Sequence, residues 1–142
     1  MKIRATHHVL TADEARRIFE FVRLPGCERV TVKVKNTRHT WGGRACLRER
    51  VLLVKMTKDP SRFPLCYRPY QYGQFKGKTY PVASMTELAV VIMAHEARHF
   101  WQHRSRSRRG YIWGARGRYS EVDTEAYAIR TLRAWRRSPH AA

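Results

Sequence analysis

The spacing of apolar residues changes several times along the chain, and each change marks an expected element. Residues 11–24, TADEARRIFEFVRL, carry apolar side chains at helical intervals. Thr11, followed three residues later by Glu14, makes a capping box at the start of this segment, and Pro25 with Gly26 ends it. The pattern predicts an amphipathic helix.

The next segments alternate between apolar and polar residues, as strands do. RVTVKVK, residues 29–35, has valine at every second position and predicts a half-buried strand. ERVLLVKM, residues 49–56, is more apolar and predicts a second strand. GGRACL, residues 42–47, predicts a third strand, bent or joined at its two glycines; residues 42–48 are a candidate sheet edge, with an internal strand as the alternative. Residues 60–81, rich in Pro, Tyr and Gly, predict an irregular loop.

Two more helices are expected in the second half of the chain. Ser84 and Glu87 form a capping box at the start of SMTELAVVIMA, residues 84–94, which is apolar nearly all round and therefore typical of a buried helix. RYSEVDTEAYAIRTLRAW, residues 118–135, predicts a helix opened by Ser120. Its expected core face consists of Val122, Ala126, Ile129 and Leu132.

These elements predict an α+β fold, with a small mixed or antiparallel sheet packed against helices. A length of 142 residues with 43% apolar content suits a single domain, residues 1–142, with a basic C-terminal region. No apolar run resembles a signal peptide or a membrane span, so we expect a cytoplasmic protein without a membrane partner. Three widely spaced cysteines, Cys27, Cys46 and Cys66, predict buried thiols and no disulfide.

Candidate chemistry comes from AHEARHFWQH, residues 94–103, which places histidines four residues apart. Positions four apart stack on one helix face, so His95 and His99 point the same way and can share one metal ion, while His103 extends the row. Glu96 lies about 100° round the helix, where it can reach a water at the metal without being a ligand. This is the H-E-x-x-H pattern. Imidazoles on a buried helix need partners, because an unpaired polar group in a core costs a few kcal/mol.

A catalytic zinc needs a third protein ligand and an open fourth position. Residues 118–135 offer three carboxylates, Glu121, Asp123 and Glu125, in a chain with only 11 Asp and Glu against 29 Lys and Arg. Helix geometry puts Glu121 and Glu125 on one face and Asp123 about 200° from Glu121. The alternative is that these acids lie near a helix terminus and pair with arginines.

H-E-x-x-H followed by a second helix with E-x-x-x-D/E resembles the gluzincin arrangement of zinc metallopeptidases, and the compact size resembles the minigluzincins and the ImmA/IrrE-type peptidases. The resemblance covers about residues 84 to 132. It implies one Zn²⁺ per chain, held by His95, His99 and Glu121, with Glu96 as the general base. Glu125 falls where the family often has an Asp that steadies a ligand histidine.

The resemblance implies hydrolysis of a peptide or protein substrate. In such peptidases an extended substrate lies against an edge strand beside the metal, and Glu96 would pass a proton from water to the leaving amine. The chain departs from the family at Thr124, where many relatives have Ala, and at Asp123, a competing carboxylate. Side chains that could donate a hydrogen bond to the transition state are His103, Tyr111, Tyr119 and Tyr127. For His103, the alternative is an exposed histidine at the helix end.

A formal net charge of +18 adds a second hypothesis. Arginines concentrate between the two metal-site helices and again in RTLRAWRR, residues 130–137. A solvated basic face is the usual explanation of a charge run, but this excess also favours an acidic partner such as nucleic acid. The alternative function is therefore a nucleic-acid-binding protein with a structural or inactive zinc site, in which His103 could be a fourth ligand. The candidate phosphate-binding residues are Arg104, Arg106, Arg108, Arg109, Arg116 and Arg118.

Overall fold

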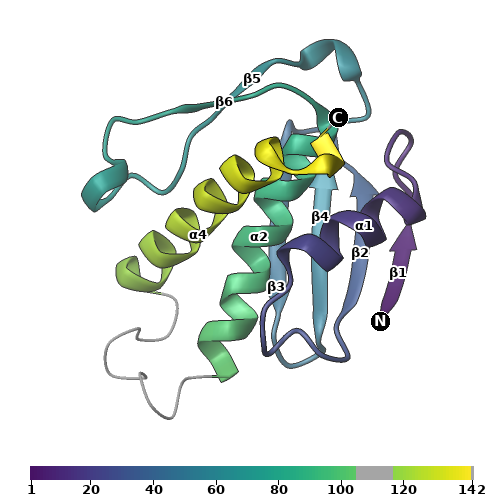
Figure 1. Ribbon diagram of the computed structural model, residues 1–142, viewed down its shortest axis with the longest axis horizontal. Coiled ribbons are helices and arrows are strands. Elements are labelled where there is room, and N and C mark those ends of the chain that lie inside the picture. Colours follow the sequence, from purple (N-terminus) through teal and green to yellow (C-terminus); the bar gives the residue numbers. More distant parts are fainter. Residues whose placement is uncertain (105–116, 142) are drawn as a thin grey trace.

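The computed structural model describes residues 1–104 and 117–141 of the chain. Its architecture is α+β, with a small mixed sheet and, within those residues, three α-helices, as the sequence predicts. Figure 1 labels the elements. In chain order they are β1 (Lys2–Ala5), α1 (Ala12–Val22), β2 (Thr31–Asn36), β3 (Trp41–Cys46), β4 (Val51–Met56), the 3-10 helix η1 (Pro60–Arg62), β5 (Leu65–Tyr67), η2 (Gly73–Phe75), β6 (Tyr80–Val82), α2 (Met85–Arg104), α4 (Arg118–Arg137) and η3 (Pro139–Ala141).

The main sheet has the strand order β1-β2-β4-β3. β1, β2 and β4 run parallel, and β3 pairs antiparallel with β4 at the edge. The candidate edge segment of the sequence is thus an edge strand, and the sheet is mixed. The valines of β2 pair in register with the inner residues of β4, Val32 with Leu52 and Val34 with Val54, and all four side chains are buried. β1 was missed because only two of its residues, Ile3 and Ala5, are partly buried.

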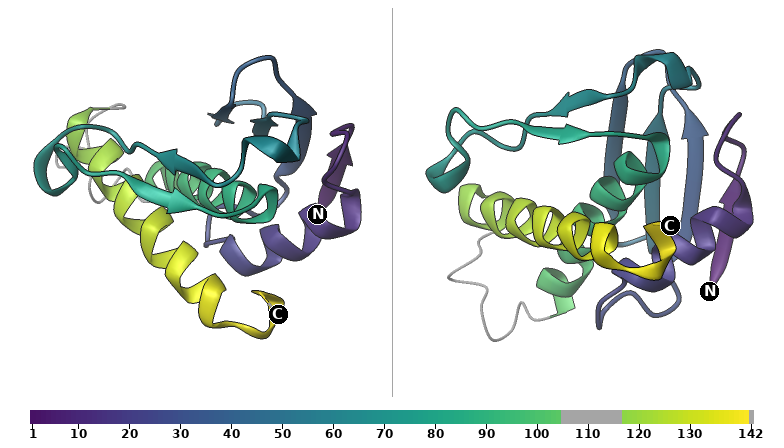
Figure 2. Two further views of the ribbon diagram at one scale, coloured as in Figure 1. Left: turned by 90° about the horizontal axis from the view of Figure 1, so that it is seen from above. Right: turned by 45° about the horizontal axis from the view of Figure 1, so that its top comes forward.

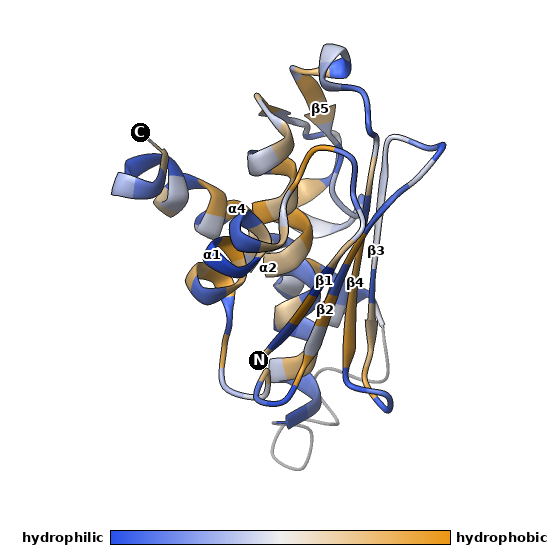
Figure 3. Ribbon diagram, turned by 90° about the vertical axis from the view of Figure 1, so that its right-hand side faces the viewer, coloured by the Kyte–Doolittle hydropathy of each residue, from blue (hydrophilic) through white to orange (hydrophobic). Residues whose placement is uncertain are grey.

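All three α-helices lie on one face of this sheet (Figure 3). α1 and α2 contact the sheet, and α4 packs on α2 as an outer layer. α2 is buried along most of its length, which explains its almost uniformly apolar sequence. Ser84 caps it by accepting a hydrogen bond from the Glu87 N–H at 3.2 Å, and the Glu87 carboxylate accepts one from the Ala83 N–H at 3.0 Å.

α4 differs from the expected helix in its start and in its inner face. It begins at Arg118 after Gly117, so Ser120 is a buried residue of the first turn and not the cap. The face turned inward carries Thr124 and Glu125 together with Ala128, Ile129, Leu132 and Trp135, while Val122 and Ala126 are only half-buried. The predicted core face is confirmed at Ile129 and Leu132, and Val122 and Ala126 pack against the core while partly exposed. The prediction did not include Thr124 and Glu125, which are buried because α4 turns them toward the histidines of α2.

The sequence predicts an irregular loop for residues 60–81, but part of this segment is regular. β5 and β6 pair antiparallel, with η2 between them, and form an arm whose tip lies beside the N-terminal half of α4 (Figures 1 and 2). Burial of all three cysteines was also a wrong prediction: Cys27 is buried, Cys46 is half-buried and Cys66 is exposed, because β5 lies in this outer arm.

Candidate metal centre

The packing of α4 on α2 brings three potential ligands together. One ligand atom each from His95, His99 and Glu121 lies within 4.8 Å of the others. His95 Nε2 is 3.3 Å from one carboxylate oxygen of Glu121, and His99 Nε2 is 3.3 Å from the other. The two imidazoles lie edge to face, with ring centroids 5.1 Å apart. Two nitrogens and a carboxylate therefore converge on one point, the donor set of a three-ligand zinc site.

The outer nitrogen of His95 faces a second carboxylate. Its Nδ1 contacts the carboxylate of Glu125, which is only 1% exposed. Tyr67 from β5 donates its hydroxyl to both oxygens of Glu125, at 2.7 and 2.8 Å, and the Tyr70 N–H donates to one of them at 3.2 Å. With the proton of His95 held on Nδ1, its Nε2 keeps a lone pair for the convergent point.

His99 is oriented in the same way by a different partner. Its Nδ1 lies 3.1 Å from the side-chain oxygen of Gln102, one turn further along α2. The amide nitrogen of Gln102 donates to the carbonyl of Ser120 and to the carboxylate of Asp123, both at 2.9 Å. Because the amide oxygen can only accept, Nδ1 of His99 donates, and the lone pair of its Nε2 is left free toward the point where the three ligand atoms converge.

Asp123, the competing carboxylate, is held away from the two histidines. Arg98 donates two hydrogen bonds to its carboxylate, of 2.7 and 3.1 Å. The Arg98 guanidinium also lies 3.8 Å from the centre of the Trp101 ring. A forked arginine–carboxylate pair has a strict planar geometry, so Asp123 is fixed in this position. The sequence left open the alternative that the acids of this helix pair with arginines. Asp123 does so, whereas Glu121 and Glu125 face histidines.

Glu96 lies at the inner side of the same cluster. It is 7% exposed, and its Oε1 is 3.9 Å from His95 Nε2. Burial raises the pKa of its carboxyl, although His95 and His99 partly offset this effect. Gly43 of β3 lies directly against it: a methyl group added at Gly43 would be 3.1 Å from Glu96 Oε1. The close approach of the edge strand to this carboxylate therefore requires glycine.

The charges of the cluster call for a cation. Burial alone would lower the pKa of His95, but its hydrogen bonds to Glu121 and Glu125 raise that pKa to about 10. The same contacts with His95 and His99 hold the pKa of Glu121 well below its ordinary range, against the effect of burial. With neutral imidazoles, the carboxylates of Glu96, Glu121 and Glu125 would leave uncompensated negative charge in a buried site. A divalent cation supplies this compensation, so the residues fit zinc.

The candidate transition-state donors are not gathered at this site in the part of the chain that is described. His103 is exposed near the end of α2. Tyr119 is 60% exposed, and Tyr127 donates its hydroxyl to the Val22 carbonyl of α1 at 2.5 Å. Tyr111 lies outside the described residues. The Thr124 hydroxyl does lie beside the cluster: it is 3.4 Å from His95 Nε2 and donates to the Glu121 carbonyl at 2.8 Å.

Most of the candidate phosphate-binding arginines lie outside the described residues: Arg106, Arg108, Arg109 and Arg116. Arg104 is exposed at the end of α2. Arg118 lies over the ring of Tyr72, with its guanidinium carbon 5.1 Å from the ring centre, and donates to the Tyr72 hydroxyl at 3.4 Å.

Three residues that shape this site escaped the sequence analysis. Gln102 follows His99 by three residues in the same helix. Side chains at this spacing are neighbours, so the contact between them could have been predicted from the sequence. Gly43 was noted only as a possible bend. Tyr67 gave no signal, because it is 58 residues away from Glu125 in the chain.

Comparisons of the chain with protein-family models, with curated proteins and with solved structures found no match. Among the helices of the described residues, none has the length and apolar content needed to cross a membrane.

Proposed function

We propose that this protein is a zinc-dependent metallopeptidase. The observation that carries the proposal is the convergence of His95 Nε2, His99 Nε2 and the Glu121 carboxylate, with the buried carboxylate of Glu96 beside them. The nitrogens that face away from this point both have acceptors, Glu125 and Gln102. Outer hydrogen bonds of this kind hold metal-binding histidines in one tautomer and orientation.

His95, His99 and Glu121 would hold the ion, and no fourth protein ligand joins this group in the described residues. Three protein ligands leave a position for water, which is the arrangement of catalytic rather than structural zinc sites. When bound, zinc would polarise a substrate carbonyl and lower the pKa of a water molecule to about 7.

Glu96 would act as the general base. Its pKa is raised by burial, toward the pH at which a proton acceptor works best. It would take the proton of the attacking water and deliver it to the leaving amine.

The substrate would bind along β3. This strand ends the sheet, and its Gly43 lies against Glu96, so a peptide paired with β3 would place its backbone beside the metal ligands. The absence of a side chain at Gly43 lets the strand lie directly against the carboxylate. Pairing with an edge strand recognises the peptide backbone, which suits a peptidase.

The test combines metal content with hydrolysis of a mixed library of fluorescence-quenched peptides. We expect about one zinc per chain and cleavage that stops on chelation and returns with added zinc. Glu96→Gln should keep the zinc and lower the rate by roughly a hundredfold or more, because it removes the base and leaves the ligands. Gln102→Leu should weaken zinc binding by about 10- to 100-fold, as expected for a residue that orients a ligand. Protein that binds no zinc, or a Glu96→Gln variant that cleaves at the full rate, would refute the proposal.

A further inference from the structure

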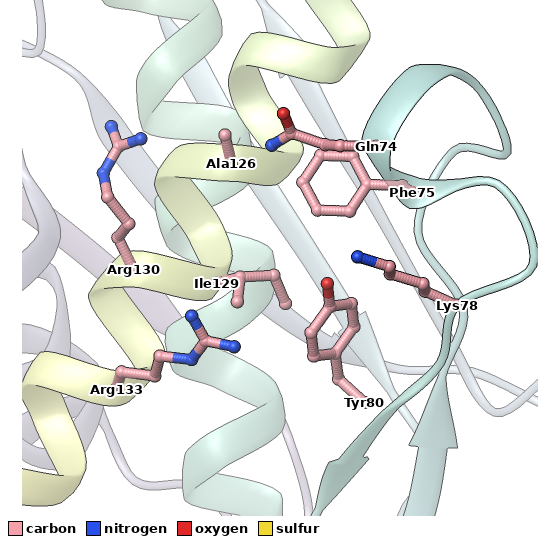
Figure 4. Close-up of a pocket in the computed structure, with 8 residues that line it drawn as sticks. All are labelled: Gln74, Phe75, Lys78, Tyr80, Ala126, Ile129, Arg130 and Arg133. Atoms are coloured by element: carbon pink, nitrogen blue, oxygen red, sulfur yellow. The ribbon is translucent and has the colours of Figure 1, made fainter.

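A second candidate site lies on the outer side of α4, away from the metal centre. A cavity of about 330 Å³ opens between α4 and the tip of the β5–β6 arm (Figure 4). Its α4 residues lie about 80° to 180° round the helix from Glu121, so they face away from the histidines. The lining residues are Gln74, Phe75, Lys78, Tyr80, Ala126, Ile129, Arg130 and Arg133.

The cavity is cationic. Lys78, Arg130 and Arg133 line it, and none of the acidic residues in the described part of the chain does. Within the described residues, no ion pair or hydrogen bond occupies the charged ends of these three side chains. Acidic residues of α2 and α4 pair with other side chains instead; Glu87, for example, forms an ion pair with Arg136 at 2.7 Å. In Figure 4 the Arg130 guanidinium points away from the arm, so Lys78 and Arg133 are the two unpaired cations that a phosphate in the cavity could meet.

The other walls are apolar and aromatic. The rings of Phe75 and Tyr80 lie edge to face with centroids 6.3 Å apart, and Ile129 is buried beneath the cavity. In Figure 4, the Lys78 amine and the Tyr80 hydroxyl point toward α4, where the Arg133 guanidinium lies beside Ile129. Gln74 adds an amide that can donate and accept hydrogen bonds. A flat ring attached to a phosphate would fit both kinds of wall, which indicates a nucleotide.

The same side of α4 carries a second group of aromatic and cationic side chains. Arg118 lies over the ring of Tyr72, and Tyr119, which is 60% exposed, meets that ring edge to face at 6.4 Å. Positions 118 and 133 are about 22 Å apart along the helix axis. Exposed aromatic rings beside cations form the stacking platforms on which single strands bind.

We propose that this surface, the nucleotide face, binds single-stranded nucleic acid. It consists of the eight cavity residues together with Tyr72, Arg118 and Tyr119. One nucleotide occupies the cavity, with its phosphate on Lys78 and Arg133 and its base against the half-buried ring of Tyr80, because Phe75 is only 3% exposed. The neighbouring bases stack on Tyr72 and Tyr119. The nucleotide face uses none of the zinc ligands, so this inference stands or falls independently of the proposed peptidase activity.

The experiment measures the binding of the full chain to a fluorescently labelled single-stranded oligonucleotide of about a dozen nucleotides by anisotropy in about 50 mM salt. Lys78→Ala/Arg133→Ala removes two cations from the cavity. Arg17→Ala/Lys58→Ala is the matched control, because it removes one arginine and one lysine from exposed positions elsewhere. We expect the cavity variant to weaken binding by about tenfold or more, and the control by less than about threefold. Tyr72→Ala should weaken it by about fivefold or more through lost stacking.

Equal losses in the cavity variant and the control would overturn the proposal, since the binding would then reflect net charge alone. So would displacement of the oligonucleotide by inorganic phosphate as effectively as by AMP, because the base would then contribute nothing. Binding of AMP without binding of the oligonucleotide would assign the cavity to a free nucleotide and overturn the strand-binding site. Thermal unfolding checks each variant, and if the alanine variant of the cavity is unfolded, Lys78→Gln/Arg133→Gln takes its place.

Discussion

Replacing Gly43 by alanine tests the contact between the edge strand and the metal-site helix. An added methyl group would lie 2.7 Å from Ile92 Cγ2, 3.1 Å from Glu96 Oε1 and 3.3 Å from Glu96 Cγ. The neighbouring Gly42 is the matched control, because a methyl group there meets no atom within 4 Å. Both glycines belong to β3, so the two variants differ mainly in what the methyl group touches.

The size of the effect follows from these distances. Carbon atoms pack best about 3.5 to 4.0 Å apart, so the methyl group and Ile92 must separate by about 1 Å. Ile92 is 2% exposed and cannot retreat freely, and overpacking of this kind costs about 1 to 3 kcal/mol. Gly42→Ala should instead gain about 0.5 to 1 kcal/mol, because alanine loses less backbone entropy on folding. Gly43→Ala gains the same entropy, so the two variants should differ by the cost of overpacking, about 1 to 3 kcal/mol in the free energy of unfolding.

Urea and thermal unfolding measure this difference. At this chain length it corresponds to a gap of roughly 3 to 12 °C in Tm, with Gly43→Ala the lower and Gly42→Ala at or above the unmodified protein. Because the methyl group also presses on the Glu96 side chain, Gly43→Ala should lower peptide hydrolysis while zinc content is kept. If both variants unfold alike, β3 does not lie as close to α2 as described, and the reasoning fails.

Three further predictions concern the metal-site carboxylates and one surface pair. Glu96→Gln should retain zinc and lose peptide hydrolysis, which metal analysis and a peptide cleavage assay measure on the same preparation. Glu121→Ala should weaken zinc binding far more than Asp123→Ala in a chelator competition; retention of zinc in the first and its loss in the second would mean that α4 is rotated from its position here. The pKa of Glu87 is held below its ordinary value by its hydrogen bonds to Arg136, so this pair stabilises the fold above about pH 4.5 and ceases to do so as the pH falls through the lowered pKa. Glu87→Gln should therefore cost about 0.5 to 1 kcal/mol at pH 7, a cost that shrinks below about pH 4 in urea unfolding; a pH-independent cost would contradict the assignment.

Local features were predicted well because their causes lie within a few residues. The capping box of Thr11 and Glu14 is present at the start of α1, and the alternating valines of β2 face the core. The four-residue spacing of His95 and His99 places both on one side of α2, because helix periodicity alone decides which side chains share a face.

Contacts between distant segments could not be predicted in this way. Helix geometry separated Asp123 from Glu121 and the family resemblance named Glu121 as the ligand, but the partner of Asp123 came only from the packing of α4 on α2, which pairs it with Arg98. The support of Glu125 by Tyr67 joins α4 to an arm that the sequence marked as an irregular loop.

The sequence by itself thus determined the three helices, the strands β2 to β4, the α+β class and the residues available for metal chemistry. The tertiary structure decided the strands β1, β5 and β6, the partners that hold His95, His99 and Asp123 in place, the close contact of Gly43 with α2, and the cavity that Lys78 and Arg133 share with two aromatic rings. The physical reason is one of range. Helix and strand periodicity acts over a few neighbouring residues, whereas side-chain partners are selected by how whole elements pack, and that packing minimises buried unpaired charge and empty space across the entire core.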